Sequence, residues 1–272
     1  MTYIKLNNGL KMPQLGLGVF RNPDGEKTEN SVKWALEAGY RHIDTAMIYK
    51  NEKSVGKAIK ESKVPREEIF LTTKLWNDDI RKGRTREAFE ESLKKLKTDY
   101  IDLYLIHWPV VGSIEAYKVM EQLYKEKKIK AIGVSNFTVG QLKELISQTD
   151  IIPSVNQIEV HPYLENGEVV NFCQKNGIAV TAYKPIGGGD GDLLKNPILV
   201  NISKEHEKSP AQISLRWGLQ RGLIVIPKST HKNRITENLN VFDFKLTKEE
   251  MKQIGSLNKN QRFSPDSDNF DF

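Results

Sequence analysis

The chain has 272 residues, of which 38% are hydrophobic, so it can bury a large core in one or two domains. Its single cysteine, Cys173, excludes an intrachain disulfide, and no apolar run approaches the roughly 20 residues needed to span a bilayer. The net charge of +6 is spread over mixed-sign segments such as 60–68 and 81–95, which is typical of solvated helices and argues against nucleic-acid binding.

The first predicted element is a β-hairpin over residues 3–12, where Asn8-Gly9 separates two short apolar runs. Further short apolar runs, many of them β-branched, follow at 15–20, 42–44, 69–74, 101–107, 131–136, 154–160, 178–183 and 223–228. Amphipathic stretches separate these runs and predict helices, with clear examples at about 27–38, 51–61 and 84–97.

Strands that alternate with helices predict βα units around a parallel sheet, and eight such strands match a (β/α)8 TIM barrel. We therefore predict one domain over residues 1–272, with the hairpin closing the bottom of the barrel. Seven of the runs carry a polar residue at or near their C-terminal end, namely Asp44, Lys74, His107, Asn136, Gln157, Tyr183 and Lys228. Because the C-terminal strand ends carry the chemistry in this fold, these residues predict a site at one barrel end. A carboxylate, an ammonium and an imidazole on consecutive strands indicate an active site.

Several segments have characteristic sequences: GYRHIDTAMIYKNE (39–52), LTTKLWN (71–77), LYLIHWP (103–109), GVSNF (133–137), VNQIEVHP (155–162) and IPKSTHKNRITEN (226–238). In these motifs and their order, the chain closely resembles the aldo-keto reductase superfamily over essentially its whole length. Within it, the chain is most similar to the prokaryotic and protozoal reductases grouped with prostaglandin F synthase and 2,5-diketo-D-gluconate reductase. The resemblance implies NADPH-dependent reduction of aldehydes or ketones by a monomeric, cytoplasmic enzyme. The implied catalytic tetrad is Asp44, Tyr49, Lys74 and His107.

The tetrad suits this chemistry. Hydride transfer to a carbonyl leaves an alkoxide that needs a proton, and a free tyrosine, with a pKa of about 10, is a poor donor at neutral pH. We expect the Lys74 ammonium to lower the pKa of Tyr49, and Asp44 to hold that ammonium in place. His107 is expected to hydrogen-bond the carbonyl oxygen. The alternative is that Asp44 and Lys74 form a structural ion pair in the barrel mouth.

The resemblance also implies a cofactor site along the later strands. It assigns Ser135, Asn136 and Gln157 to the nicotinamide carboxamide and Tyr183 to stacking on its ring. Taken alone, Tyr183 would more often be a core residue at the barrel rim. The glycine-rich segment 185–191 is expected to approach the pyrophosphate, and the contacts assigned here are Lys184, Pro185, Ile186 and Gly187. No G-x-G-x-x-G follows a strand into a helix, so a Rossmann domain is not expected.

The segment 226–238 places Lys228 and Ser229 at the last strand end and Arg234 in a following helical stretch. Phosphate groups favour helix N-termini and guanidinium partners. The resemblance assigns Lys228, Ser229 and Arg234 to the 2′-phosphate of NADPH, and Glu237 and Asn238 to adenine. For Arg234 alone, a solvated surface charge is the alternative.

Lys184 departs from the family pattern. Related proteins commonly read Y/W-S-P-L-G where this chain has Tyr183-Lys184-Pro185-Ile186-Gly187. The serine of that pattern contacts the pyrophosphate, and we predict that the longer Lys184 side chain places an ammonium near the same group. The alternative is that Lys184 points into solvent.

The resemblance places Phe20, Trp76 and Trp108 around an apolar substrate pocket above Tyr49, with His107 at its base and the C-terminal segment near Phe263 closing one side. That segment, after about residue 257, has no helical or strand pattern, and its aromatic residues Phe263, Phe270 and Phe272 need somewhere to pack.

The sequence shows no pattern of a metal site or of a membrane partner. His42, Glu159 and His161 lack the spacing of metal ligands, so no metal is expected. The N-terminus lacks a basic region followed by an apolar stretch, so we expect no signal peptide and no membrane partner. Two other functions stay open: a non-enzymatic member that binds the cofactor, and a phosphate-binding isomerase or hydrolase on the same fold.

Overall fold

The computed structural model describes residues 1–189, 192–270 and 272. Its central feature is an eight-stranded sheet of parallel neighbours, in the order β10-β9-β8-β7-β6-β5-β4-β3. The strands are β3 (Leu17–Gly18), β4 (His42–Asp44), β5 (Phe70–Leu75), β6 (Leu103–Ile106), β7 (Ile132–Ser135), β8 (Val155–Glu159), β9 (Ala179–Tyr183) and β10 (Ile224–Val225). Parallel bridges Leu15–Val225 and Gly18–Lys228 join the first strand to the last. The predicted (β/α)8 barrel is confirmed.

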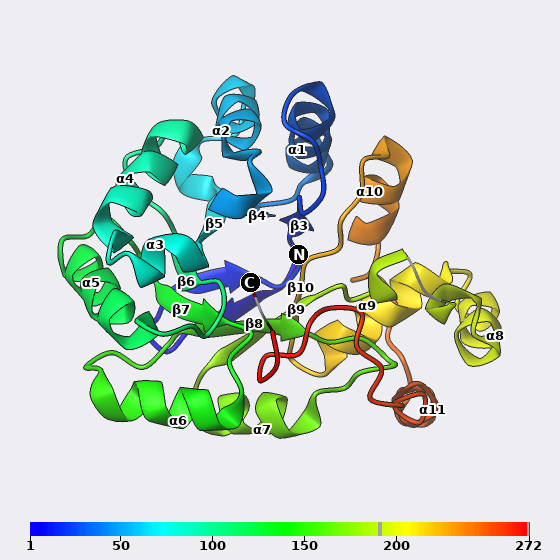
Figure 1. The fold of residues 1–272 in the computed structure, drawn as a ribbon. Coiled ribbons are helices and arrows are strands. Elements are labelled where there is room, and N and C mark those ends of the chain that lie inside the picture. Colours follow the sequence, from blue (N-terminus) through cyan, green and yellow to red (C-terminus); the bar gives the residue numbers. More distant parts are fainter. Residues whose placement is uncertain (190–191, 271) are drawn as a thin grey trace.

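Helices surround this barrel on the outside (Figure 1). They are α1 (Glu26–Ala38), α2 (Glu52–Glu61), α3 (Asn77–Arg81), α4 (Thr85–Leu96), α5 (Ser113–Lys125), α6 (Val139–Gln148), α7 (Gly167–Lys175), α8 (Pro197–Glu205), α9 (Pro210–Gln220), α10 (Lys232–Leu239) and α11 (Lys248–Gly255). Short 3-10 turns are η1 (Met47–Tyr49), η2 (Arg66–Glu68), η3 (Gly187–Gly189) and η4 (Leu193–Lys195). Every residue of β5 is buried, as expected of a strand with the barrel core on one face and helices on the other.

The first and last strands are shorter than the runs 15–20 and 223–228 that predicted them. At this seam, the backbone N–H of Gly16 donates to Val225 O at 2.9 Å, and that of Gly18 donates to Pro227 O at 3.1 Å. Pro227 has no N–H to donate back, so one hydrogen bond of the ladder is missing there and the regular strands end early. A Cβ at Gly18 would lie 2.9 Å from the carbonyl oxygen of Ile226, so the close approach of the two strands requires glycine.

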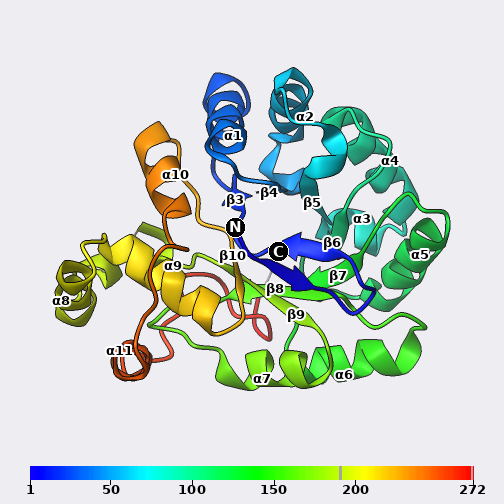
Figure 2. The same cartoon turned by 180° about the vertical axis from the view of Figure 1, so that it is seen from behind.

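The two open ends of the barrel are covered by different segments. The predicted hairpin is present, with β1 (Tyr3–Lys5) antiparallel to β2 (Lys11–Pro13). Its Leu6 and Met12 pack with inward-facing residues of the lower barrel, so it closes the bottom. The C-terminal segment, red in Figure 1, crosses the opposite end of the barrel. Figure 2 shows the molecule from behind, with the hairpin in dark blue. Within the described ranges, no helix is both long and apolar enough to cross a membrane.

One helix crossing leaves no room for a side chain. A Cβ on Gly56 of α2 would lie 2.5 Å from the carbonyl carbon and oxygen of Leu96, at the end of α4. Because backbone cannot rotate away, Gly56→Ala should force the helices apart and lower the free energy of unfolding by about 1–3 kcal/mol. Chemical denaturation followed by circular dichroism measures this change.

Gly140 provides the matched control for Gly56. It lies in α6, and a Cβ there would meet nothing within 4 Å. Gly140→Ala should leave stability unchanged or raise it by about 0.5–1 kcal/mol, because alanine favours helix over glycine. Equal stability of the two variants would contradict the close-packing argument.

Candidate active site

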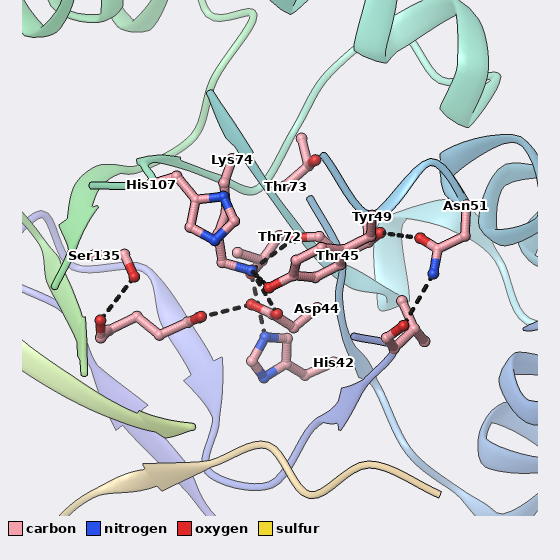
Figure 3. A network of polar contacts seen from close by, with 12 residues as sticks. His42, Asp44, Thr45, Tyr49, Asn51, Thr72, Thr73, Lys74, His107 and Ser135 are labelled. Carbon is pink, nitrogen blue, oxygen red and sulfur yellow. Dashed lines mark hydrogen bonds and ion pairs between the residues drawn. The ribbon is translucent and has the colours of Figure 1, made fainter. Parts of the chain in front are cut away.

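The four predicted catalytic residues meet at the C-terminal end of the barrel (Figure 3). Asp44 is the last residue of β4, Lys74 lies near the end of β5, and His107 directly follows β6. Tyr49 ends the short turn η1, which follows β4. Because neighbouring parallel strands end at the same edge, these side chains converge from four points of the sequence.

Lys74 is the centre of the polar contacts. Its side chain is fully buried, and its ammonium donates to Asp44 Oδ1 at 2.7 Å and to the Thr45 carbonyl at 2.8 Å. The Tyr49 hydroxyl oxygen lies farther from it, at 3.5 Å. The ammonium therefore contacts both a carboxylate and the phenol.

The protonation of this cluster is set mainly by burial. Burial lowers the pKa of Lys74, and the Asp44 carboxylate opposes that change. Burial, followed by the Asp44 and Tyr183 charges, raises the pKa of Tyr49 well above its usual value. The net shift is upward because burial and the Asp44 charge raise the pKa of Tyr49, and the expected effect of Lys74 on the phenol stays a prediction. The phenol keeps its proton at neutral pH.

His107 lies beside the phenol ring of Tyr49. Its ring is edge-on to that of Tyr49, with centroids 5.7 Å apart. Burial, with a smaller effect from the Lys74 charge, lowers the pKa of His107 well below its usual value. The imidazole is therefore neutral at physiological pH and can donate one hydrogen bond without carrying charge.

Gln157 makes a contact that the sequence did not predict. Its side-chain amide donates to Asp44 Oδ2 at 2.7 Å, so both carboxylate oxygens of Asp44 have buried partners. Gln157 is on β8 and Asp44 on β4, and the contact therefore runs across the interior of the barrel. No sequence pattern connects two residues so far apart.

The residues assigned to the nicotinamide form a continuous row. Ser135 pairs with Gln157 in the β7–β8 register, and Glu159 pairs with Tyr183 between β8 and β9. The Asn136 amide donates to the His107 carbonyl at 3.0 Å, and its oxygen accepts from the Tyr183 hydroxyl at 2.7 Å. This row of polar groups, beside an aromatic ring and next to the tetrad, suits a planar amide-bearing ring.

The segment after β9 turns sharply at Lys184, which has a left-handed backbone with φ 49°. Pro185 accepts a hydrogen bond from Ser214 at 2.6 Å, Ile186 packs on the core, and Gly187 has φ 76°. The Lys184 ammonium donates to the Phe263 carbonyl and so lies against the C-terminal segment. The predicted glycine-rich stretch continues through residues 190–191, which lie outside the described residues.

The residues predicted to bind the 2′-phosphate and the adenine of the cofactor follow β10. Lys228 is exposed, and its pKa is lowered by partial burial and then by the positive charges of Arg21 and Lys27. Ser229 is buried, and Arg234 is exposed on α10. The assigned adenine residues lie further along α10, where Glu237 accepts from the Ser209 hydroxyl and Asn238 is buried. A gathering of cations at a strand end fits a polyanionic ligand.

Aromatic side chains form a wall above the tetrad. The Phe20 ring lies 5.0 Å from Tyr49, and the Trp76 ring lies 5.2 Å from His107. Trp108 is almost completely buried, because rings of the C-terminal segment pack on it. The predicted pocket residues are therefore brought together.

The C-terminal segment packs against this aromatic wall through Phe270 and Phe272, and not through Phe263 as predicted. Phe272 stacks on Trp76 with centroids 5.8 Å apart, and Phe270 lies 4.9 Å from Trp108. Phe263 instead lies over His161, at 5.0 Å, with its backbone N–H bonded to Glu159. The prediction that the segment closes the pocket near Phe263 needs this correction: Phe263 is anchored beside β8 and β9, and the two later rings reach the tryptophans.

No group of three or more His, Cys, Asp or Glu residues that could hold a metal ion occurs in the described part of the chain. His161 and Glu159, whose spacing did not predict a metal site, bond to each other at 2.9 Å. His42 contacts Thr72 at 3.2 Å beneath Asp44, and burial lowers its pKa to about 4.

Comparison with known proteins places this geometry in a family. The aldo/keto reductase family model matches residues 14–259. The 9,11-endoperoxide prostaglandin H2 reductase of Trypanosoma cruzi is 53% identical, over 98% of this chain and 95% of its own. Glyoxal reductase of Bacillus subtilis is 49% identical, over 97% of this chain and 96% of its own. The crystal structure of MGS-M4, an aldo-keto reductase from a Medee basin deep-sea metagenome library, superposes with a TM-score of 0.96 at 49% identity, covering 99% of this chain and all of that one.

These matches extend over nearly the full length of each protein and bear reductase names, which favours a reductase over the isomerase or hydrolase that the fold alone would allow. The chain belongs to the aldo/keto reductase family and is an oxidoreductase that acts on carbonyl groups.

Proposed function

We propose that the protein reduces aldehydes and ketones to alcohols with NADPH, and that Tyr49 donates the proton. The observation that carries this proposal is the position of the Tyr49 hydroxyl, 3.5 Å from a buried ammonium and beside the His107 ring at the open end of the barrel. A carbonyl placed between Tyr49 and His107 would have hydrogen-bond donors on both sides.

The proposed reaction conserves atoms and charge. NADPH, when bound, supplies a hydride to the carbonyl carbon. The π electrons of the carbonyl move to oxygen, and the proton of the Tyr49 hydroxyl passes to that oxygen, giving the alcohol. The phenolate that remains is stabilised by the Lys74 ammonium, which Asp44 holds at 2.7 Å. Neutral His107 orients the carbonyl oxygen.

The residues assigned to the cofactor fit nicotinamide adenine dinucleotide phosphate. Ser135, Asn136 and Gln157 offer amide and hydroxyl groups in a row beside the tetrad, and Tyr183 offers a ring face. At the other end, Lys228 lies near enough to Arg21 and Lys27 for their charges to lower its pKa, and an anionic phosphate would relieve that repulsion. We assign the first group to the nicotinamide and Lys228, Ser229 and Arg234 to the 2′-phosphate.

The substrate assignment follows from the aromatic wall. With Phe270 and Phe272 packed on Trp108 and Trp76, the space above Tyr49 has an apolar boundary. A panel of aliphatic, aromatic and α-dicarbonyl substrates, with NADPH oxidation followed optically, tests the proposed activity. Absence of turnover with every carbonyl in the panel, despite NADPH binding, would favour the non-enzymatic alternative. From the family we also propose that the enzyme is monomeric and cytoplasmic.

Lys184 is proposed to contribute to pyrophosphate binding. Its ammonium donates to the Phe263 carbonyl, and its charge also lowers the pKa of Glu159, so a cation lies next to the glycine-rich segment that is expected to approach the pyrophosphate. Because a partly exposed charge contact contributes only about 0.2–1 kcal/mol, Lys184→Met should weaken NADPH binding by a few-fold and flatten its salt dependence. Fluorescence titration at low and high salt measures both effects.

Lys125 provides the control for this titration. It is an exposed lysine at the end of α5, near Asp150, and Lys125→Met should leave affinity and salt slope unchanged. If Lys184→Met also matches the native protein in both, Lys184 serves only to hold the C-terminal segment.

A further inference from the structure

Two turns bring the proposed proton donor and the pocket wall together. Phe20 lies in the turn after β3, and Tyr49 lies in the turn after β4, with their rings 5.0 Å apart. Each turn contains a non-glycine residue with a left-handed backbone, Arg21 at φ 60° and Lys50 at φ 56°. This conformation is disfavoured for residues with a Cβ, so contacts elsewhere must hold both turns in place.

One side chain, that of Asn51, holds both turns. Its amide nitrogen donates to the carbonyls of Val19, at 2.9 Å, and Asn22, at 3.0 Å, at the two ends of the Phe20 turn. Its oxygen accepts from the Thr45 hydroxyl at 2.8 Å. Asn51 is 0% exposed, and both of its donors are used, so no water is needed to satisfy them. Figure 3 shows Asn51 beside Thr45 and Tyr49.

The partners of Asn51 are connected directly to the tetrad. The Thr45 carbonyl accepts from the Lys74 ammonium at 2.8 Å, and the Val19 N–H donates to the Asp44 carbonyl at 3.1 Å. Asn51 itself contacts none of the tetrad side chains. It therefore lies one contact away from Lys74 and Asp44 and two residues after Tyr49 in the chain, and its three hydrogen bonds are made by a fully buried side chain.

We propose that Asn51 is a positioning residue for proton transfer, which locks the Tyr49 turn to the Phe20 turn so that phenol and pocket wall keep one arrangement around the carbonyl. This inference rests on the proposed role of Tyr49. A loss of geometry well below 1 Å is enough to slow an enzymatic step severalfold, since about 1 Å of misplacement can lower a rate by about 10²-fold. A purely structural asparagine would instead affect stability and every kinetic constant together.

Kinetics of three variants test the proposal. Asn51→Ala should lower kcat by about ten- to thirtyfold, with the NADPH dissociation constant within about twofold of native. Thr45→Val replaces the hydroxyl that donates a hydrogen bond to Asn51 and keeps the rest of the side-chain shape. This variant should lower kcat by about three- to tenfold. Thr45→Ser restores that hydroxyl and should restore kcat to within about twofold. If Asn51→Ala does not fold, the Thr45 pair alone decides.

Asn7 is the matched control because it makes the same set of bonds at the opposite end of the barrel. Its amide donates to the carbonyls of Ile152, at 3.3 Å, and Pro153, at 3.1 Å, and its oxygen accepts from the Ser154 hydroxyl at 2.7 Å. Unlike Asn51, it is exposed. Asn7→Ala removes the same three contacts and should leave kcat unchanged.

A double-mutant cycle separates positioning from general weakening of the fold. If Asn51 acts through the phenol, Asn51→Ala should lower kcat in the native background and have little effect on the residual rate of a Tyr49→Phe enzyme. An equal loss in both backgrounds, or a native kcat in Asn51→Ala while Tyr49→Phe is inactive, would overturn the proposal. A fully active Tyr49→Phe would instead overturn the proposed function.

Discussion

Replacing Tyr49 with phenylalanine is expected to lower kcat for carbonyl reduction by about 10²–10⁴-fold or more, with NADPH binding nearly unchanged. The substitution removes one oxygen atom and leaves the ring contacts with Phe20 and His107 available. Among the tetrad, only the phenol combines a transferable proton with a position beside both Lys74 and His107, because burial keeps the pKa of Tyr49 high and that of His107 low. Steady-state kinetics, with fluorescence titration of NADPH, measures the two quantities.

Tyr104→Phe is the control for this experiment. Tyr104 lies on β6, is fully buried against Phe89, and its hydroxyl has no hydrogen-bond partner among the described residues. Removing that hydroxyl should leave kcat and cofactor affinity as they are. A Tyr49→Phe enzyme with near-native kcat would refute the mechanism.

NADPH should be preferred over NADH by about a hundredfold or more in kcat/KM, because Lys228 and Arg234 are assigned to the 2′-phosphate. Hydrogen bonds to charged groups contribute roughly 1.5–3 kcal/mol each, so two such contacts are sufficient for this preference. The nearby charges of Arg21 and Lys27 add to the attraction for an anion. The ratio of kcat/KM for the two cofactors should also fall at high salt, since exposed charges are screened.

Arg234→Met should reduce this preference by raising KM for NADPH and leaving KM for NADH nearly constant. Lys232 supplies the control, as an exposed lysine at the start of the same helix whose ammonium already lies 3.7 Å from the Glu37 carboxylate. Lys232→Met should change the cofactor ratio much less. Equal kcat/KM for NADPH and NADH in the native enzyme would contradict the phosphate assignment.

The two expected effects rest on different parts of the barrel end. The proton donor depends on β4, β5 and β6, which are adjacent in the sheet and carry Asp44, Lys74 and His107. The phosphate contacts depend on β10 and α10, at the seam where the last strand meets the first. Loss of cofactor preference with full kcat, or the reverse, is therefore physically possible, and the two experiments are independent.

Much of this arrangement could be predicted from residues alone. The run 42–44 corresponds to β4 without any shift, and the other strand predictions overlap their strands, because short β-branched runs between amphipathic helices leave few alternatives. Once eight parallel strands close into a barrel, residues at their C-terminal ends must meet. The convergence of Asp44, Lys74 and His107 follows from that rule and the order of the strands.

Only the tertiary structure decided the contacts between residues that are distant in sequence, because no helical or strand periodicity predicts such contacts. The bond from Gln157 to Asp44 crosses the barrel interior, and Asn51 reaches the separate turn at Val19, neither of which leaves a signal in local sequence. The sign of the Tyr49 pKa shift was also beyond the sequence. It depends on burial and on the distance to the Asp44 charge, and a sequence gives neither.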